Sequence, residues 1–545
     1  MKKLLAVALA GCMTVSLAAC GGGDKPAEGG SGAAEGLDVC FASEPATIDP
    51  ALNSSVDGGI ITQHAFEGLI KWGDPNGDGK AELVPGMAED WDVEEDGTLY
   101  TFHLREDATW SDGEPVTAND FVYAWNRLAD PATAADYSYM LDPVVGFDST
   151  VEGETHPEIS APDDYTFVVK LDVPTSYFEE LCAFPALLPV RQDIIEEHGD
   201  NWTFEPETYV CNGPYKMESW SHNESITLVK RDDYYNADEV INPSLTFHLM
   251  DDDNAILAGR RSGELDFIQG VPPQEIPSLL ESGDLEIEEY IGTYYTCFNT
   301  QKAPFDNPMV RKAFSLVIDR NHITKTVKGD GSVPAGAFVP EGMYDAAGPG
   351  SSFREVGGNF VDPSEDAYAA NCEEARALLA EAGYPNGEGF PTVVYLYNTN
   401  EGHKAIGESL KDMWEKELGV TVQLENQDWN VFLEERKQGN FSIARGGWIA
   451  DYNDPMCFLD MFVTDGGNND PQYSNPEYDK LIGQIKKTAD NEERMQLMHD
   501  AEQFIMDQAV VAPIYYYVQP YMQDENLTGW YYTPLGFFFF EGAHK

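Results

Sequence analysis

Apolar residues recur along this chain at two different periods, and the periods alternate. Tyr100, Phe102 and Leu104 are separated by polar residues, and this two-residue period predicts a half-buried strand. Toward the C-terminus, short apolar runs alternate with longer segments whose apolar residues lie three or four apart. The expected strands cover 392–397, 420–424, 441–444 and 510–518, and the expected helices cover 404–418, 430–437, 477–487 and 491–507. Strands that alternate with helices predict an α/β fold in which helices cover a sheet.

Local signals also predict where individual helices begin and end. Thr117 is followed three residues later by Asp120, which is the spacing of a capping box, and the helix it opens is expected to run through Arg127. Another helix is expected to start after Asn371 and to stop at Gly383, because glycine readily adopts the backbone conformation that ends a helix.

The chain is long enough for several domains and is strongly acidic. Its 545 residues, 42% of them hydrophobic, suffice for about two to four domains or lobes. The 95 Asp and Glu residues outnumber the 33 Lys and Arg residues, and the formal net charge is −62. Because nucleic-acid binding requires a basic surface, we expect no nucleic-acid partner. We interpret the acidity as a source of solubility and assign it no catalytic role.

The first residues have the pattern of an export signal. Lys2 and Lys3 precede an apolar run, 4–10, that is too short to cross a membrane. Leu-Ala-Ala-Cys at 17–20 resembles a bacterial lipobox, which predicts a signal peptide over 1–19 and a lipid on Cys20. An ordinary signal peptide with a chance cysteine is the alternative. Residues 20–36 are rich in glycine and predict a flexible tether. We therefore expect a lipid-anchored protein on the extracytoplasmic face of the cell membrane.

Neither the cysteines nor the acidic loops predict a metal or a cofactor. No Cys-x-x-Cys occurs, and the pairing of the six scattered cysteines beyond the lipobox cannot be deduced from the sequence. These are Cys40, Cys182, Cys211, Cys297, Cys372 and Cys457. The loop 74–79 resembles the first half of a calcium-binding EF-hand loop, but Pro85 stands where the bidentate glutamate is required. We interpret this loop as a turn, with a weak calcium site as the alternative.

Seven sequence blocks and one longer segment point to a family. The blocks are Ala65–Leu69, Ala88–Trp91, Trp110–Val122, Asn212–Tyr215, Arg261–Asp266, Phe305–Arg311 and Leu378–Tyr384. The longer segment, 436–455, places two arginines, a tryptophan and an aspartate in a strand-like stretch and its exit loop, where α/β proteins often bind ligands. From Leu37 to its C-terminus the chain resembles the periplasmic oligopeptide-binding proteins, which are the substrate receptors of peptide ABC importers.

The resemblance implies a fold of the type II periplasmic binding proteins, with two lobes and a ligand cleft between them. It implies a first lobe made of 37–66, 190–300 and 514–545, and a smaller inserted domain at 67–189. The second lobe is then 301–513. Lobes of this kind close on a ligand by a hinge.

The same resemblance assigns ligand contacts within the segment 436–455. A free peptide is a zwitterion, so its receptor needs an anion for the amine and a cation for the carboxylate. Asp451 matches the family residue that holds the α-ammonium, and Arg445 and Arg436 match arginines near the carboxyl end. Trp448 is expected to wall the cleft beside the peptide backbone, at the bend made with Gly447.

Each of these residues also has a purely structural alternative. Asp451 lies in a turn-rich sequence, and capping a helix or a turn is its alternative role. The arginines have Glu434, Glu435 or a helix end as alternative partners. Trp448 has ordinary core packing as its alternative.

Three further positions match family residues that face the cleft. Asn398 and His403 correspond to positions that reach the carboxyl end of longer peptides, and Tyr137 corresponds to a tyrosine of the inserted domain. A lone histidine or tyrosine is also common in ordinary packing. The chain departs from the family's best-known Gram-negative members at two positions. Ser54 replaces an acidic residue, and Ile449 replaces a disulfide cysteine.

These features favour a peptide-binding lipoprotein that delivers its ligand to a membrane permease and its ATPase subunits, and that acts as a monomer. The alternatives are the same scaffold with another ligand, such as a sugar, a metal chelate or a cell-wall peptide or peptide signal, and a secreted enzyme. We expect no enzymatic activity, because the chain has no Gly-x-Ser-x-Gly, His-Glu-x-x-His or phosphate-binding loop. A pair of carboxylates acting as a glycosidase is the one chemistry that the sequence leaves open.

Overall fold

The computed structural model describes residues 36–41, 43–151 and 155–545. The predicted signal peptide, the lipid on Cys20 and the tether up to residue 35 lie outside the described residues. Within the described part of the chain, no helix is both long and apolar enough to span a bilayer.

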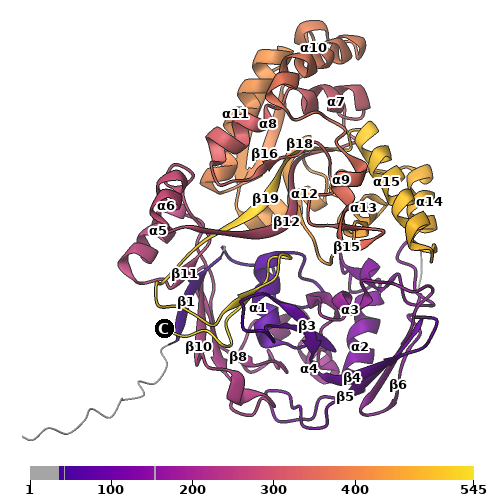
Figure 1. Cartoon of the computed structure of the whole chain (residues 1–545), viewed down its shortest axis with the longest axis vertical. Coiled ribbons are helices and arrows are strands. Elements are labelled where there is room, and N and C mark those ends of the chain that lie inside the picture. The colour runs from indigo at the N-terminus through magenta and orange to yellow at the C-terminus, as the bar shows by residue number, and fades with distance from the viewer. Residues whose placement is uncertain (1–35, 42, 152–154) are drawn as a thin grey trace, which may run out of the picture. The chain divides into compact units, whose positions relative to one another are not determined.

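A mixed sheet of eleven strands connects distant parts of the described chain (Figure 1). Its order is β17 (Val422–Gln427), β16 (Val393–Asn398), β18 (Ile443–Ile449), β12 (Glu286–Phe298), β19 (Val511–Gln523), β11 (Phe267–Ile268), β1 (Leu37–Cys40), β10 (Ser244–His248), β9 (Ser225–Lys230) and β8 (Tyr215–Ser221), with β13 (Val333–Pro334) beside β19. β16 is parallel to β17 and β18, and β1 is parallel to β10 and β11. The sheet therefore has a parallel group at each end.

The two long strands β12 and β19 join these groups. They pair antiparallel with each other, and β12 also pairs with β18 while β19 pairs with β11. The register of β12 against β19 shifts between Glu289 and Thr293, between the two groups. β12 borders one group, β19 borders the other, and the two strands pair with each other, so the groups are continuous. The lobe boundary expected at 513/514 falls inside β19, and the one expected at 300/301 falls just after the end of β12. The boundaries of the lobes and of the inserted domain stay predictions.

Helices cover the β16–β18 end of the sheet. They are α7 (Pro308–Leu316), α8 (Arg320–His322), α10 (Glu365–Glu381), α11 (Glu401–Leu418) and α12 (Trp429–Lys437). Their apolar faces enclose a core around Phe305, Phe314 and Trp414, which are completely buried. Burial of such large side chains contributes roughly 1.5–3 kcal/mol each. Beside this layer lie α9 (Phe353–Gly357), α13 (Met456–Leu459), α14 (Pro476–Ile485), α15 (Asn491–Asp507), β14 (Tyr344–Asp345) and β15 (Gly348–Ser352).

Most elements expected from periodicity are present within a few residues, but the start of α10 is wrong. This helix begins at Glu365, not after Asn371, and Ser364 is its N-cap residue. The Asn371 side chain does not cap the helix. Its Nδ2 donates to the carbonyl of Asp362, 3.0 Å away, so the residue lies inside the helix. The predicted stop at Gly383 agrees with the structure, because Gly383 has a φ of +100°.

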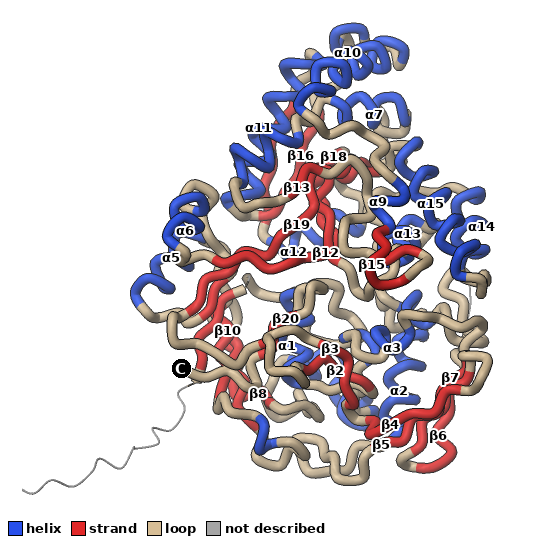
Figure 2. The backbone as a smooth tube through the Cα atoms, in the orientation of Figure 1, coloured by secondary structure: helices blue, strands red, loops and turns tan. Residues whose placement is uncertain are grey.

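A separate four-stranded sheet lies within the segment that was expected to be inserted (Figure 2). Its order is β4 (Ala88–Val93), β5 (Leu99–Leu104), β7 (Thr166–Lys170) and β6 (Ile159–Asp163), and the hairpin β2 (Ile70–Gly73)–β3 (Glu82–Pro85) precedes it. The helices of this region are α2 (Ala118–Ala129), α3 (Phe178–Leu181) and α4 (Gln192–His198). α2 opens with the predicted capping box between Thr117 and Asp120. α1 (Val56–Ala65), α5 (Asp253–Ser262), α6 (Ile276–Ser282) and the short β20 (Tyr531–Tyr532) and β21 (Phe538–Phe539) complete the β1–β10 end.

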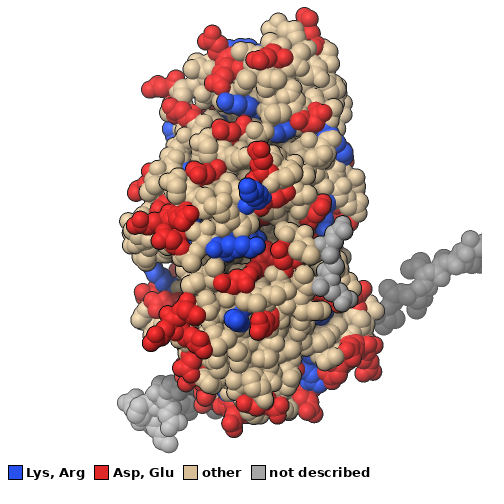
Figure 3. All heavy atoms as spheres, turned by 90° about the vertical axis from the view of Figure 1, so that its right-hand side faces the viewer, with Lys and Arg blue, Asp and Glu red and all other residues tan. Residues whose placement is uncertain are grey.

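The loop 74–79 forms a turn, and the cysteines of the described chain are buried. In the loop, the Asp74 carboxylate accepts hydrogen bonds from the backbone N–H groups of Asp78 and Gly79, which is the chemistry of a turn. The six cysteines of the described chain are all buried and unpaired. The surface is predominantly acidic on the face shown in Figure 3, in keeping with the net charge.

Candidate functional site

All eight residues that were expected to contact a ligand line one cavity of about 600 Å³. They are Tyr137, Asn398, His403, Arg436, Arg445, Gly447, Trp448 and Asp451. The cavity lies between the two ends of the large sheet, because its walls include Asp57 of α1 on one side and β18 and α12 on the other. Residues separated by more than 300 positions in the sequence are thus brought to one site.

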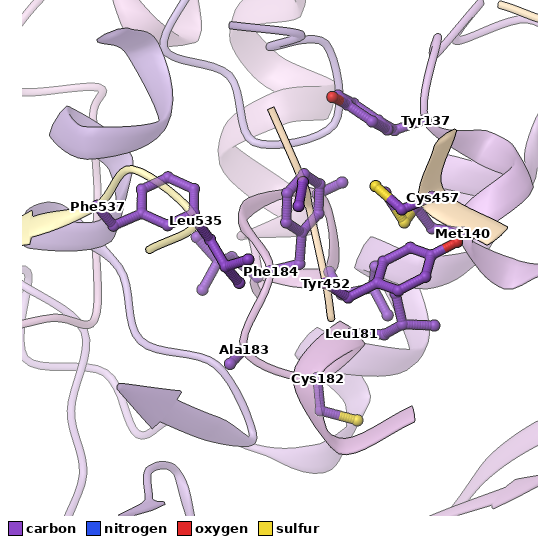
Figure 4. Close-up of a cluster of buried hydrophobic side chains, with 14 of the residues drawn as sticks. Tyr137, Met140, Leu181, Cys182, Ala183, Phe184, Tyr452, Cys457, Leu535 and Phe537 are labelled. Carbon is purple, nitrogen blue, oxygen red and sulfur yellow. The ribbon is translucent and has the colours of Figure 1, made fainter. Parts of the chain in front are cut away.

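Asp451 lies at the wall of this cavity, directly after β18, and is only 9% exposed. Its Oδ1 accepts a hydrogen bond from the Tyr137 hydroxyl at 3.1 Å, and its Oδ2 accepts one from Cys457 Sγ at 3.5 Å. The backbone N–H of Asp451 donates back to the same sulfur at 3.1 Å. Figure 4 shows Tyr137, Cys457 and Phe184 in a cluster of buried, mostly apolar side chains. A carboxylate held by neutral donors in an apolar surrounding is a good acceptor for a cation.

Burial raises the pKa of Asp451 to about 8, against the opposing effect of the hydrogen bonds from Tyr137 and Cys457. A positive charge placed beside the carboxyl would restore the ionised form. In the described residues, Asp451 forms no ion pair, and the like charge of Asp460 also raises its pKa. The electrostatics therefore favour an external cation at this point.

Trp448 and Gly447 shape the backbone wall next to Asp451. The Trp448 Nε1 donates to the carbonyl of Cys457 at 2.9 Å, and the ring lies 6.3 Å from that of Tyr137. Trp448 is therefore both packed and in contact with the cavity, so the two interpretations given above do not exclude each other. A side chain at Gly447 would place its Cβ only 2.4 Å from the Tyr517 hydroxyl, so the close approach of the strand to Tyr517 requires glycine.

The two arginines have different surroundings. Arg436 Nη2 forms an ion pair with Asp470 Oδ2 at 2.8 Å, so its partner is neither Glu434 nor Glu435. Arg445 forms no ion pair in the described part of the chain; its guanidinium lies 5.6 Å from the ring centre of Tyr294 and 5.7 Å from that of Trp429. Of the two, Arg445 is the cation whose charge remains available to a ligand anion.

Asn398 and His403 lie at the end of β16 and in the first turn of α11. Asn398 Oδ1 is a buried acceptor without a partner in the described residues. The backbone N–H of His403 donates a hydrogen bond to Asn400 Oδ1 at 3.1 Å, and Asn400 thereby caps α11. The ring of His403 lies close to that of Tyr294. Burial, together with the charges of Arg445 and Lys328, holds the pKa of His403 well below its usual value. The imidazole is therefore neutral and offers hydrogen bonds instead of charge.

Contacts across the cleft hold the two sides together. Lys437 pairs with Asp136 at 2.6 Å, and the backbone N–H of Asn453 donates to Glu180 Oε2 at 2.6 Å. The rings of Tyr177 and Tyr452 stack with their centres 4.4 Å apart. The side chains on 301–513 thus reach directly to the segment 67–189.

Several residues of the site were not found from the sequence. Asp470, Cys457, Tyr517, Trp429, Asp57 and Asp253 all lie at or beside the cavity. The partners of Asp470 and Cys457 lie 34 and six residues away and follow no helical or strand spacing. The density of polar and aromatic residues around 429–470 was a signal only for Trp429, Cys457 and Asp470, since the other three residues lie elsewhere in the chain.

Comparison with known proteins identifies the family. The model of the bacterial extracellular solute-binding proteins, family 5 Middle, matches residues 82–470. The chain belongs to this family of solute-binding proteins. Over 561 residues it is 36% identical to the oligopeptide-binding protein OppA of Bacillus subtilis, and the alignment covers 100% of this chain and 99% of that protein.

Solved structures agree with this assignment and establish the fold. The structure of Haemophilus influenzae OppA in complex with RPPGFSPFR matches this solute-binding protein with a TM-score of 0.86 at 34% identity, covering 94% of this chain and 99% of the other. The fold is therefore the two-lobed, type II periplasmic binding protein fold that the family resemblance implied.

Two structures of one relative, MppA, show which conformation the present structure resembles. The Escherichia coli murein tripeptide binding protein MppA matches with a TM-score of 0.86 at 31% identity, covering 93% of this chain and 98% of the other. The unliganded open form of MppA matches with a TM-score of only 0.60, over 93% of this chain and 96% of the other. The arrangement described here is therefore unlike that open form, in keeping with the contacts that cross the cleft.

Proposed function

We propose that this protein captures oligopeptides in the cavity between its lobes and delivers them to a membrane permease for import. The observation that carries the proposal is the pairing of opposite charges on one cavity wall. Asp451 is a buried carboxyl group without an ion-pair partner among the described residues, and a ligand cation would hold it in its ionised form. Arg445, six residues earlier, is a cation that also has no ion-pair partner among the described residues. A free peptide presents an ammonium and a carboxylate at its ends, and this wall offers one partner for each.

The roles of the individual residues follow from this arrangement. Asp451 binds the α-ammonium, with Tyr137 and Cys457 fixing its two oxygens. Arg445 binds the carboxylate of a short peptide, while Arg436 stays paired with Asp470 and supports the wall. Trp448 packs against the peptide backbone beside Gly447. Asn398 and the neutral His403 form hydrogen bonds with longer ligands, as donors or as acceptors.

Other ligand classes fit this wall less well. A sugar carries no charge to match either group, and burying Asp451 and Arg445 without counter-charges is costly. The protein named as the probable deoxycholate-binding YgiS of Escherichia coli is 32% identical, so the scaffold alone does not decide the ligand. The charged pair does favour a zwitterion. We infer no enzymatic role, because the proposed chemistry is capture and release.

The test is native mass spectrometry of the purified protein and of two variants. The unaltered protein is expected to carry peptides of mixed sequence. Asp451→Ala is expected to lose them, while Asp366→Ala, an exposed aspartate of α10 outside the cavity, is expected to keep them. A single non-peptide mass in the unaltered protein, or peptides retained equally in Asp451→Ala, would show that the proposed assignment is wrong.

We further propose that a lipid on Cys20 anchors the protein as a monomer to the extracytoplasmic face of the membrane, close to the permease and its ATPase subunits. The support is the lipobox-like sequence at 17–20 and the glycine-rich segment that follows. Cys20→Ser is expected to release the protein from the membrane fraction, whereas Cys12→Ser within the signal is expected to leave it attached. Release of both variants, or of neither, would contradict the anchor.

A further inference from the structure

A second cavity, of about 430 Å³, lies apart from the proposed peptide cavity. Among the described residues, the two cavities share no lining residue. A cluster of buried side chains borders both of them. Figure 4 shows Met140, Leu181 and Tyr452, which line the second cavity, in the same cluster as Tyr137 and Phe184, which line the first. The second cavity is therefore not a subsite of the first.

Both sides of the cleft contribute walls to the second cavity. The segment 67–189 supplies one side, and the segment 301–513 supplies the other. Pro174 on the first side and Ala489 on the second are exposed lining residues, so the cavity opens to solvent. Its volume lies within the range of small-molecule sites, which is roughly 300–1,000 Å³.

Four charged side chains line the second cavity, and three of them have close partners. The guanidinium of Arg494 donates to both carboxylate oxygens of Asp454, a residue outside the lining, at 2.7 and 2.8 Å. Lys486 Nζ donates a hydrogen bond to Asp142 Oδ2 across the cleft. The fourth charged residue of the lining is Asp460.

The bonding of Asp460 is incomplete. The residue is only 5% exposed, and its Oδ1 is buried without a hydrogen-bond partner among the described residues. Its Oδ2 lies 3.8 Å from Lys486 Nζ, which is too far for a hydrogen bond. A buried carboxyl group without donors is costly. Because Asp460 lines the cavity, a donor on a bound molecule would complete its bonding.

The charges around the second cavity have a negative excess. Asp142, Asp454 and Asp460 carry three negative charges when ionised, and Lys486 and Arg494 carry two positive charges. One further positive charge would balance this group. Burial raises the pKa of Asp460 to about 7 against the effect of Lys486, and the like charges of Asp142 and Asp454 add to the rise. A cation beside Asp460 would favour its ionised form.

The missing cation is expected to be organic. No group of acidic, histidine or cysteine side chains in the described part of the chain has the arrangement of a metal site. The cavity is also lined by four tyrosines, Tyr100, Tyr139, Tyr177 and Tyr452. Aromatic rings pack against apolar groups and attract cations to their faces. The lining therefore suits an apolar or aromatic body joined to a positive charge.

We infer that the second cavity binds a small organic amine with an aromatic or apolar body, and that the ammonium group of this amine pairs with Asp460. The N–H groups of the amine supply the donors that the carboxyl group lacks, and its charge balances the negative excess. Its body packs against the tyrosine rings. The inference goes beyond the proposed peptide binding and does not depend on it, because the two cavities have separate linings.

Isothermal titration with phenethylamine and with phenethyl alcohol tests the inference. The two probes have nearly the same size, and only the amine is charged at neutral pH. The protein is first saturated with tri-alanine, so that the amine cannot bind to Asp451. The amine is expected to bind at least about tenfold more tightly than the alcohol, because it forms charge-assisted hydrogen bonds with Asp460. Equal affinities, or no binding of the amine, would overturn the inference.

Two buried carboxyl groups are compared to locate the amine. Asp460→Asn keeps the shape of the side chain and removes its charge, and it is expected to weaken phenethylamine binding about tenfold, to the level of the alcohol. Asp451→Asn makes the same change in the peptide cavity and is expected to bind the amine as the unaltered protein does. An unchanged affinity in Asp460→Asn, or an equal loss in both variants, would show that Asp460 does not hold the amine.

A measurement on the unaltered protein decides the question if Asp460→Asn fails to fold. In a crystal structure with phenethylamine and tri-alanine, the amine nitrogen is expected within about 3.2 Å of an Asp460 oxygen. An amine found only at Asp451, or one whose nitrogen lies away from Asp460, would overturn the inference. Failure of the peptide proposal is a separate result, since the first cavity would then lack tri-alanine while the amine occupies the second.

Discussion

The Tyr137 hydroxyl donates a hydrogen bond to Asp451 Oδ1 over 3.1 Å, although the two residues are 314 positions apart in the sequence. Tyr137 belongs to the segment 67–189, and Asp451 follows β18 of the opposite lobe. The proposed ammonium-binding group is therefore completed only when the two sides of the cleft meet. In the proposed function, this contact would couple ligand binding to lobe closure.

Removing the Tyr137 hydroxyl is expected to weaken the binding of every peptide by a similar factor. Tyr137→Phe keeps the ring that packs against Phe184 and Trp448 but leaves Asp451 Oδ1 without its donor. The expected loss is about 1 kcal/mol, or roughly five- to tenfold in affinity, measured by isothermal titration. Tyr165→Phe, a partly buried tyrosine outside the cavity, serves as the control and is expected to have no effect. A selective loss for some sequences only would contradict a role at the ligand amine.

Peptide affinity is expected to pass through a maximum near pH 8. The pKa of Asp451 is about 8, so at lower pH the carboxyl is protonated and must lose its proton before it pairs with an ammonium. Above about pH 8 the α-amine of the peptide itself loses its charge, because its pKa is about 7.7–8.0. The affinity should therefore fall on both sides of this value, by at most about tenfold for each pH unit below it.

Proton release provides the direct check of this pH dependence. Titrations at pH 7 in buffers of different ionisation enthalpy are expected to show close to one proton released for each peptide bound. The Asp451→Asn variant should release none from this position. If the unaltered protein also releases none, Asp451 is already ionised before the ligand arrives, and the pH profile must have another origin.

The same carboxyl is expected to reduce the stability of the protein at high pH. The pKa of Asp451 is raised from 3.8 to about 8, so between these values the folded protein holds a proton that the unfolded chain has lost. The free energy of unfolding contributed by this group therefore falls as the pH rises through this window. Asp451→Asn cannot ionise and is expected to be more stable than the unaltered protein at pH 8, by roughly 2 kcal/mol or more.

Denaturant unfolding at two pH values would measure this difference. The gain from Asp451→Asn should be small at pH 4.5, where the carboxyl is largely protonated in the fold, and larger at pH 8. The exposed Asp366→Asn is the matched control and should change neither value. A gain of equal size at both pH values would attribute the effect to packing and not to the ionisation of Asp451.

The sequence predicted the elements and the site residues to different extents. Periodicity located α11 and β16, because their apolar faces are regular and the left-handed Gly419 ends the helix. It misplaced the start of α10, since Asn371 has the residue type of an N-cap but sits inside the helix. Local patterns cannot distinguish a capping asparagine from one that bonds to a neighbouring loop.

The candidate site was predicted through resemblance, and its hydrogen bonds and ion pairs became apparent only from the structure. Nothing in the sequence near Asp451 indicates that Tyr137 and Cys457 hold its two oxygens. The two arginines look alike in the sequence, yet Asp470 neutralises Arg436 and leaves Arg445 without an ion pair in the described chain. These pairings depend on contacts between distant segments, so patterns within a short window do not contain them.

This difference between the arginines leads to a final prediction about the carboxyl end of the ligand. Arg445→Lys keeps the positive charge but loses the planar group that lies over Tyr294 and Trp429 and that can bind a carboxylate through two parallel hydrogen bonds. The affinity for a tripeptide with a free carboxylate is expected to fall about tenfold. The affinity for the same tripeptide with an amidated C-terminus, which is weaker from the start, should change by less than about threefold. Arg436→Lys, whose partner is Asp470, is the comparison and should affect both peptides alike. Equal losses for the free and the amidated peptide in Arg445→Lys would place the carboxylate elsewhere in the cavity.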